Sequence, residues 1–262
     1  MLSVDITNFD LRMKNLLLSL LLLLGCFSAF ASQPPTDSVK AAKKQKTYAM
    51  KLTTRIHSMG LFSYAGRLVS DNPALDFNFA YDRKEFGFMF YKAFDLYDCH
   101  SDNNFSLALL YHHFKLGNRW TFTPGVGFVI DQTHNIIANK GSDASVIITT
   151  AFKVNSSLTI DHSSVTPNMI IESGDRDWIN RLRFLYSKSH LDVGLTVWHN
   201  NKVFDHTEYL TTGLNITYAR IPINDHIFIN TGITGVLMPY SNDEEAYPKR
   251  NGIVFTLAAV VH

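Results

Sequence analysis

Residues 74–94, ALDFNFAYDRKEFGFMFYKAF, decide the fold of this chain. Apolar and polar side chains alternate on both sides of a polar turn, Asp82-Arg83-Lys84-Glu85. Successive side chains of a β-strand point to opposite faces, so this alternation gives each strand one apolar face. That face carries Leu75, Phe77, Phe79 and Tyr81 on the first strand, and Phe86, Phe88, Phe90 and Phe94 on the second. The stretch therefore predicts an antiparallel hairpin with one strongly apolar face.

The same pattern continues to the end of the chain, and tight turns alternate with longer polar loops. The expected strands are residues 48–58, 74–81, 86–94, 105–116, 120–132, 143–153, 158–165, 178–187, 191–199, 208–220, 226–237 and 251–262. The segment 59–72 can either extend the flanking strands or form a loop. Strands of roughly 9–11 residues cross a bilayer when tilted, and short turns at one rim with long loops at the other are typical of membrane barrels. We therefore predict an all-β fold, a closed antiparallel up-and-down transmembrane β-barrel of about 12 strands.

The first segment has the features of a secretory signal peptide. Met13-Lys14-Asn15 gives a charged start, residues 16–24 form an apolar core too short to span a bilayer, and Ala29-Phe30-Ala31 is a small-residue cleavage site. We expect residues 1–31 to be a signal peptide whose true start is Met13. A competing interpretation is a lipoprotein signal, in which Cys26 is acylated.

The residues that follow the cleavage site are polar. Residues 32–47 have no apolar periodicity, which predicts a disordered periplasmic tail, and the β-barrel is expected to occupy residues 48–262. After cleavage Cys99 is the remaining cysteine of two, so no internal disulfide is expected. The formal net charge of +1 argues against a nucleic-acid partner, because nucleic acid calls for a basic face.

The signal peptide, the repeated hairpins and a last strand that runs to His262 resemble bacterial outer-membrane β-barrel proteins as a class. The resemblance implies location in the bacterial outer membrane, contact with membrane lipid and lipopolysaccharide, and insertion by the outer-membrane assembly machinery. It implies no functional residues. The chain departs from the class by ending in Val260-Val261-His262, where an aromatic residue is usual, and we expect the imidazole to substitute in part.

One local pattern points to an esterase. His162 and Ser164 lie two residues apart on an expected strand, so they share a face. The His-x-Ser pair resembles the active strand of lipid A deacylases and a pair found in outer-membrane phospholipases. By that resemblance Ser164 is the nucleophile, His162 the base and Glu172 the orienting acid. The chain departs from the deacylases because Val165 follows the serine where they have asparagine. The alternative is a histidine and a serine with a structural role at the membrane interface.

Charged residues of the expected strands point to a lumen. Arg181 and Arg183 share one face, and a charge in the lipid at mid-depth costs roughly 2–4 kcal/mol, so both are expected to point inward. They can bias a pore toward anions, or they can pair across the interior with Asp131, Asp161 or Asp192.

The remaining candidates give no strong signal. The residues His134, His199, His206 and Asp205 are expected near loop ends on one rim, where they can bind zinc or simply be solvated. The sequence predicts no metal site and no cofactor. The leading hypothesis is a non-enzymatic barrel of porin-like or structural role, which passes small solutes or acts as a surface scaffold. The alternatives are an outer-membrane lipid esterase that uses Ser164 and His162, and a soluble periplasmic lipid-binding β-barrel.

Overall fold

The structure is a computed structural model in which twelve strands close into a barrel. It describes residues 48–62, 66–98, 103–130, 143–167, 169–170, 177–204 and 206–262. The predicted signal peptide (residues 1–31) and tail (residues 32–47) lie outside the described residues and stay predictions. No helix in the described part is long and apolar enough to cross a membrane.

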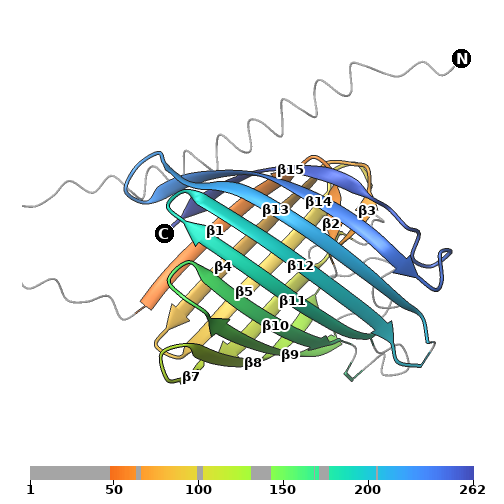
Figure 1. Cartoon of the computed structure of the whole chain (residues 1–262), viewed down its shortest axis with the longest axis horizontal. Coiled ribbons are helices and arrows are strands. Elements are labelled where there is room, and N and C mark those ends of the chain that lie inside the picture. The colour runs from red at the N-terminus through yellow and green to blue at the C-terminus, as the bar shows by residue number, and fades with distance from the viewer. Residues whose placement is uncertain are drawn as a thin grey trace, which may run out of the picture. The chain divides into compact units, whose positions relative to one another are not determined.

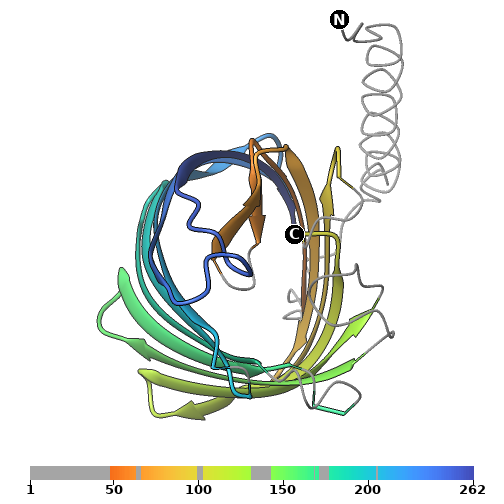
Figure 2. The same cartoon turned by 90° about the vertical axis from the view of Figure 1, so that its right-hand side faces the viewer.

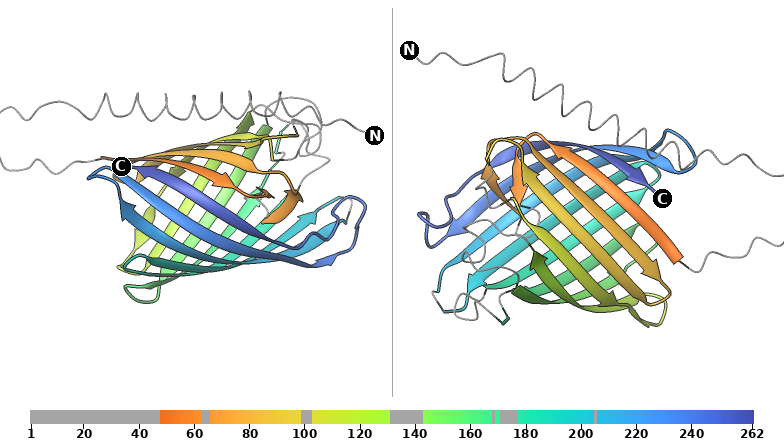
Figure 3. Two further views of the ribbon diagram at one scale, coloured as in Figure 1. Left: turned by 90° about the horizontal axis from the view of Figure 1, so that it is seen from above. Right: turned by 180° about the vertical axis from the view of Figure 1, so that it is seen from behind.

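Each wall strand pairs antiparallel with its neighbours in sequence, and the first strand, β1, pairs with the last, β15, which closes the ring. The wall strands are β1 (Tyr48–His57), β4 (Ala74–Arg83), β5 (Phe86–Asp95), β6 (Ser106–His112), β8 (Trp120–Ile130), β9 (Asp143–Lys153), β10 (Leu158–Thr166), β11 (Asp177–Lys188), β12 (Leu191–Lys202), β13 (Glu208–Pro222), β14 (Ile227–Ser241) and β15 (Gly252–Val261). The strands run obliquely around the ring, as in tilted membrane barrels (Figures 1 and 3). The predicted fold class is confirmed.

The register separates the two faces of the wall. Phe79 of β4 lies opposite Leu52 of β1 and Phe90 of β5, so an apolar row crosses three strands on the outside. The residue that precedes Phe79 on β4, Asn78, points into the lumen. The same alternation leaves large apolar side chains exposed on the outer wall of the other strands, among them Leu110, Val126, Leu182, Leu214, Ile233 and Phe255. Because exposed apolar side chains are unfavourable in water, this outer wall suits hydrocarbon.

The two rims of the barrel differ in their connections. Tight turns, such as the one from Arg83 to Phe86, lie at the rim where β1 begins and β15 ends, which we call the turn end. The longer connections lie at the opposite rim, the loop end. The predicted strand 208–220 continues to Pro222. Beyond a register shift between Tyr218 and Ile221, Ile221 pairs with Ile229 and Pro222 pairs with Phe228. Proline is tolerated there because a strand end needs no further N–H donor.

The segment 59–72 neither extends the wall nor forms a plain loop. It contains β2 (Gly60–Phe62) and β3 (Arg67–Ser70), which form a separate two-stranded sheet. Figure 2, which looks along the barrel, shows this hairpin inside the ring. We call its described residues, 60–62 and 66–70, the plug hairpin. A further short strand, β7 (Phe114–Leu116), pairs with β8 alone and continues β6 after a break at His113.

Candidate functional site in the barrel lumen

A first charged cluster in the lumen is built around Asp76, whose side chain is buried. Arg55 Nε donates to Asp76 Oδ1 at 2.8 Å, and His57 Nε2 lies 2.8 Å from Asp76 Oδ2. The other ring nitrogen of His57 lies 2.9 Å from Thr256 Oγ1 on β15, which closes a network across the β1–β15 seam. A buried carboxylate is costly unless it is paired and hydrogen-bonded, and this one has both kinds of partner. We call this group the Asp76 cluster.

A second cluster lies on the opposite part of the wall, around Asp161 of β10. Arg181 Nη2 donates to Asp161 Oδ1 at 3.0 Å, and Arg183 Nε donates to Asp161 Oδ2 at 2.8 Å. Arg181 Nη2 also donates to Ser163 Oγ at 2.8 Å, and its guanidinium lies 5.3 Å from the ring centroid of Trp198. Two guanidinium groups share one carboxylate, and we call this group the Asp161 cluster.

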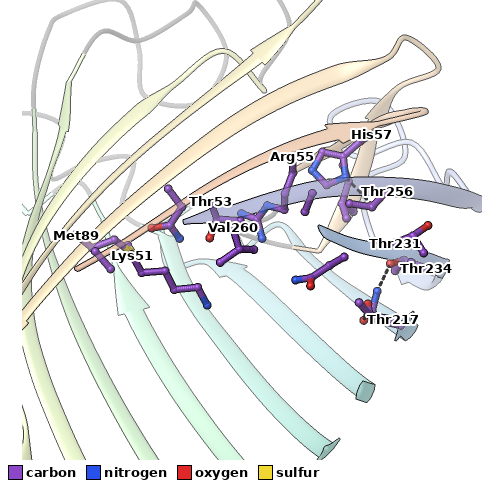
Figure 4. Close-up of a pocket in the computed structure, with 17 residues that line it drawn as sticks. Lys51, Thr53, Arg55, His57, Met89, Thr217, Thr231, Thr234, Thr256 and Val260 are labelled. Atoms are coloured by element: carbon purple, nitrogen blue, oxygen red, sulfur yellow. Dashed lines mark hydrogen bonds between the residues drawn. The ribbon is translucent and has the colours of Figure 1, made fainter. Parts of the chain in front are cut away.

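Two cavities occupy the lumen between these clusters. The first chamber has a volume of about 480 Å³ and runs along β1, β13, β14 and β15. About half of its lining residues have hydroxyl or amide side chains, and Lys51 is an exposed cation (Figure 4). The second chamber, of about 300 Å³, lies against β5, β6, β9, β10 and β11. Arg55, Asn78 and Met89 line both chambers, so the two adjoin at these side chains.

At the loop end of the lumen, apolar side chains of the plug hairpin pack against the wall. Leu68 of the plug hairpin packs against Val236 and Val254 of the wall. A second group reaches from one side of the wall to the other through the plug hairpin and the β14–β15 loop; it consists of Tyr91, Ala93, Phe105, Leu107, Tyr209 and Met238, with Val69, Met89 and Tyr247 against it. The plug hairpin is therefore packed against the wall and is not a loose loop.

Two glycines make room for the plug hairpin. Gly66 has a positive φ of 67°, and a Cβ at this position would lie 2.1 Å from Trp198 Cδ1. A Cβ at Gly252 would lie 2.8 Å from Leu68 Cδ1. Both close approaches need a residue without a side chain.

The predicted lumen charges fall into three groups. Arg181, Arg183 and Asp161 lie together in the Asp161 cluster. Asp192 lies near the turn end, where its Oδ1 atom is 3.0 Å from Arg220 Nη2. Asp131 lies outside the described residues.

The predicted esterase residues lie on the outer wall. His162 and Ser164 point away from the lumen, since the intervening Ser163 contacts Arg181 inside it. Ser164 Oγ accepts a hydrogen bond from Trp178 Nε1 at 2.7 Å, and no hydrogen bond joins it to His162, both residues being described. Glu172 lies outside the described residues. The catalytic roles of these residues stay predictions.

The predicted histidine rim shows no metal-ligand set. His199 Nε2 lies 3.3 Å from Glu208 Oε2, whereas His134 and Asp205 fall outside the described residues. In the part of the chain that the structure describes, no group of three or more His, Cys, Asp or Glu side chains could hold a metal ion.

Sequence reasoning missed the Asp76 cluster. The signal was present in β1, where Lys51, Thr53, Arg55 and His57 recur with a period of two and mark one face as polar. The partner Asp76 sits in the polar set of the hairpin that decided the fold. Only the register, in which Arg55 lies opposite Asp76, brings the two together.

Comparison with known proteins gives the fold. No family model matches the chain, and no curated protein matches its sequence. A KdgM porin is similar in structure with a TM-score of 0.56 at 8% sequence identity, over 81% of this chain and 98% of the porin. A NanC porin gives a TM-score of 0.54 at 10% identity, over 82% of this chain and 100% of the porin. At these identities the likeness shows the barrel fold alone.

Proposed function

We propose that the protein is a bacterial outer-membrane channel for small solutes, closed at its loop end by the plug hairpin. The observation that carries this proposal is a polar, charge-lined lumen with two cavities inside a barrel whose outer wall is apolar. A soluble lipid-binding barrel would have the reverse arrangement, with its apolar side chains inside. The similar folds of a KdgM porin and a NanC porin support the same function.

The size of the barrel fits a channel better than a scaffold. Eight-stranded barrels are just filled by their own side chains, whereas a twelve-stranded wall encloses more space than its inward residues fill. Here the extra space is taken partly by the cavities and partly by the plug hairpin. The turn end, which holds both ends of the barrel sequence, is assigned to the periplasm and the loop end to the exterior.

The plug hairpin is suited to leave the lumen without unfolding the wall. It forms its own two-stranded sheet, so no strand ladder ties it to the barrel. It is held by side-chain contacts such as Leu68 with Val236 and the Arg67 guanidinium over the Tyr247 ring, at 5.3 Å from the ring centroid. Such contacts can be lost together while every wall strand keeps both neighbours.

The test is conductance in planar bilayers with purified, refolded protein. We expect the wild type to show rare conductance steps, and a variant in which residues 60–70 are replaced by a short Gly-Ser linker to show frequent and larger ones. Heat-modifiable migration on gels checks that both proteins are folded barrels. Folded protein that shows no current in either form would refute the channel and leave the scaffold.

A further inference from the structure

A groove in the outer wall reaches the turn end of the barrel. It crosses β4, β5, β6, β8 and β9 and has a volume of about 1190 Å³. Small-molecule sites usually have about 300–1,000 Å³, so the groove has room for a larger, lipid-sized molecule. Its floor is a row of side chains that the register places opposite one another from strand to strand, namely Tyr81, Phe88, Leu110, Val126 and Val146. We call these five residues the floor row.

The strand ladder is interrupted at the edge of this groove. Pairing of β6 with β8 stops at Tyr111, and pairing of β7 with β8 starts only at Phe114. Pro124 of β8 lies in this gap and has no N–H to donate to a neighbouring strand. Pro124 and His112 both line the groove. The groove therefore lies at a local irregularity of the wall rather than on its evenly paired part.

The lip of the groove at the turn end carries two exposed cations, Arg83 and Lys84. Neither side chain forms an ion pair with any residue that the structure describes. One carboxylate also lines the groove, that of Glu85, and its Oε2 atom lies 3.6 Å from His112 Nε2. A guanidinium group matches the geometry of a phosphate, and an ammonium group binds it as a point charge. The lip is therefore suited to a phosphate group.

Aromatic side chains indicate the depth of the lip in the membrane. Phe86, Phe114 and Trp120 are exposed on the outer wall close to the turn end. Aromatic girdles of this kind lie at the two interfaces of membrane barrels. Arg83 and Lys84 are therefore at the height of the lipid headgroups. The floor row lies farther from the turns, at the height of the acyl chains.

We propose that this groove binds one anionic phospholipid of the periplasmic leaflet, with phosphatidylglycerol as the representative. The phosphate contacts Arg83 and Lys84, and an acyl chain packs on the floor row. A phospholipid is the expected occupant because the turn end is assigned to the periplasm, and the periplasmic leaflet of a bacterial outer membrane consists of phospholipids. The site is on the outer wall, so it binds lipid whether or not the lumen conducts ions.

The test is native mass spectrometry of the purified full-length protein, refolded in detergent. Phosphatidylglycerol, phosphatidylethanolamine and lipid A are titrated separately, and the fraction of barrels that retain one lipid is measured. The two phospholipids are used with identical acyl chains, so they differ only in the headgroup and its charge. We expect saturable binding of one phosphatidylglycerol, at least tenfold tighter than binding of phosphatidylethanolamine.

Each other outcome of these titrations would overturn the proposal. Equal binding of the two phospholipids would show that lipid coats the outer wall without a specific site. Tighter binding of lipid A would assign the groove to the opposite leaflet. A protein dimer that phosphatidylglycerol does not displace would assign it to a second copy of the chain.

A matched pair of double variants tests the lip. Arg83→Gln/Lys84→Gln removes both cations of the groove, whereas Lys153→Gln/Lys188→Gln removes two exposed lysines of the same rim that do not line it. The net charge changes equally in both. A basic residue at the membrane surface contributes about fivefold to the affinity for an anionic lipid. We expect about 25-fold weaker binding of phosphatidylglycerol in the first variant and less than twofold in the second.

A second pair tests the floor row. Val126→Phe adds bulk in the groove, and Leu214→Phe adds bulk at a similarly exposed position of the outer wall that does not line it. We expect about tenfold weaker binding in Val126→Phe and no change in Leu214→Phe. Heat-modifiable migration checks that every variant is a folded barrel, and the comparison of the two phospholipids on the wild type needs no variant. Equal losses within either pair would contradict the proposed site.

Discussion

Leu68→Ala tests whether the plug hairpin closes the lumen. Leu68 is 2% exposed, and its side chain joins the plug hairpin to Val236 and Val254 of the wall. A buried leucine shortened to alanine costs about 2–5 kcal/mol. The contact lies between the plug hairpin and the wall, so this cost falls on docking of the hairpin rather than on pairing of the wall strands. At about 1.4 kcal/mol for each factor of ten, the ratio of open to closed barrels rises roughly 30-fold at the lower bound.

The assay is single-channel recording of wild-type and Leu68→Ala protein under the same voltage and salt. The control is Leu110→Ala, which removes the same atoms from the outer wall, where Leu110 is 57% exposed and touches no part of the plug hairpin. We expect the open probability to rise strongly in Leu68→Ala and to stay at the wild-type value in Leu110→Ala. An unchanged open probability in folded Leu68→Ala barrels would refute the reasoning, because the obstruction would then not depend on this packing.

Three further predictions concern other parts of the account. Gly66→Ala places a Cβ 2.1 Å from Trp198 Cδ1 at a φ of +67°, so we expect it to displace the plug hairpin and to raise the conductance; a conductance equal to the wild type would contradict this. Asp161→Asn leaves Arg181 and Arg183 without their shared carboxylate, a loss of about 3–5 kcal/mol for a fully buried pair and less here because both arginines are partly exposed. We therefore expect a lower melting temperature and a reversal potential shifted toward that of chloride, and a shift toward the cation would count against the lumen assignment. Ser164→Ala removes the acceptor of the Trp178 hydrogen bond and about 1 kcal/mol of stability; we expect fatty-acid release from lipopolysaccharide to be the same as in the wild type, and release that the substitution abolishes would establish the esterase interpretation.

The wall strands were predictable from the sequence because the pattern that defines each strand lies within that strand. Each strand alternates along its own length, so the opposite directions of Asn78 and Phe79 follow from period-two patterning alone. Closure followed from the same pattern, because an apolar outer wall in lipid leaves no place for an unpaired edge. The inward direction expected for Arg181 and Arg183 came from the same argument, combined with the cost of a charge in lipid.

The plug hairpin and the pairing of charges were not predictable, because they depend on contacts between distant parts of the chain. The packing role of Leu68 can be recognised only from its neighbours in the fold, which are Val236, Val254 and the backbone of Gly252. The segment that contains it, residues 59–72, has no regular alternation of apolar and polar side chains, so its sequence resembles that of a loop. Arg181 pairs with Asp161 rather than with another carboxylate because of the strand register. The alternation of side chains in the sequence does not determine this register to the exact residue.

A cysteine scan of β13 tests the central claim most directly. Single cysteines at positions 214 to 217 are introduced in a background that lacks Cys26 and Cys99, and the protein is reconstituted in lipid vesicles. Asn215 and Thr217 line the first chamber, whereas Leu214 and Ile216 are about half exposed on the outer wall. The account predicts that a water-soluble, lipid-impermeant thiol reagent labels positions 215 and 217 and spares 214 and 216. Labelling of all four positions, or of 214 and 216 instead, would show that the apolar wall faces water and would contradict the membrane barrel.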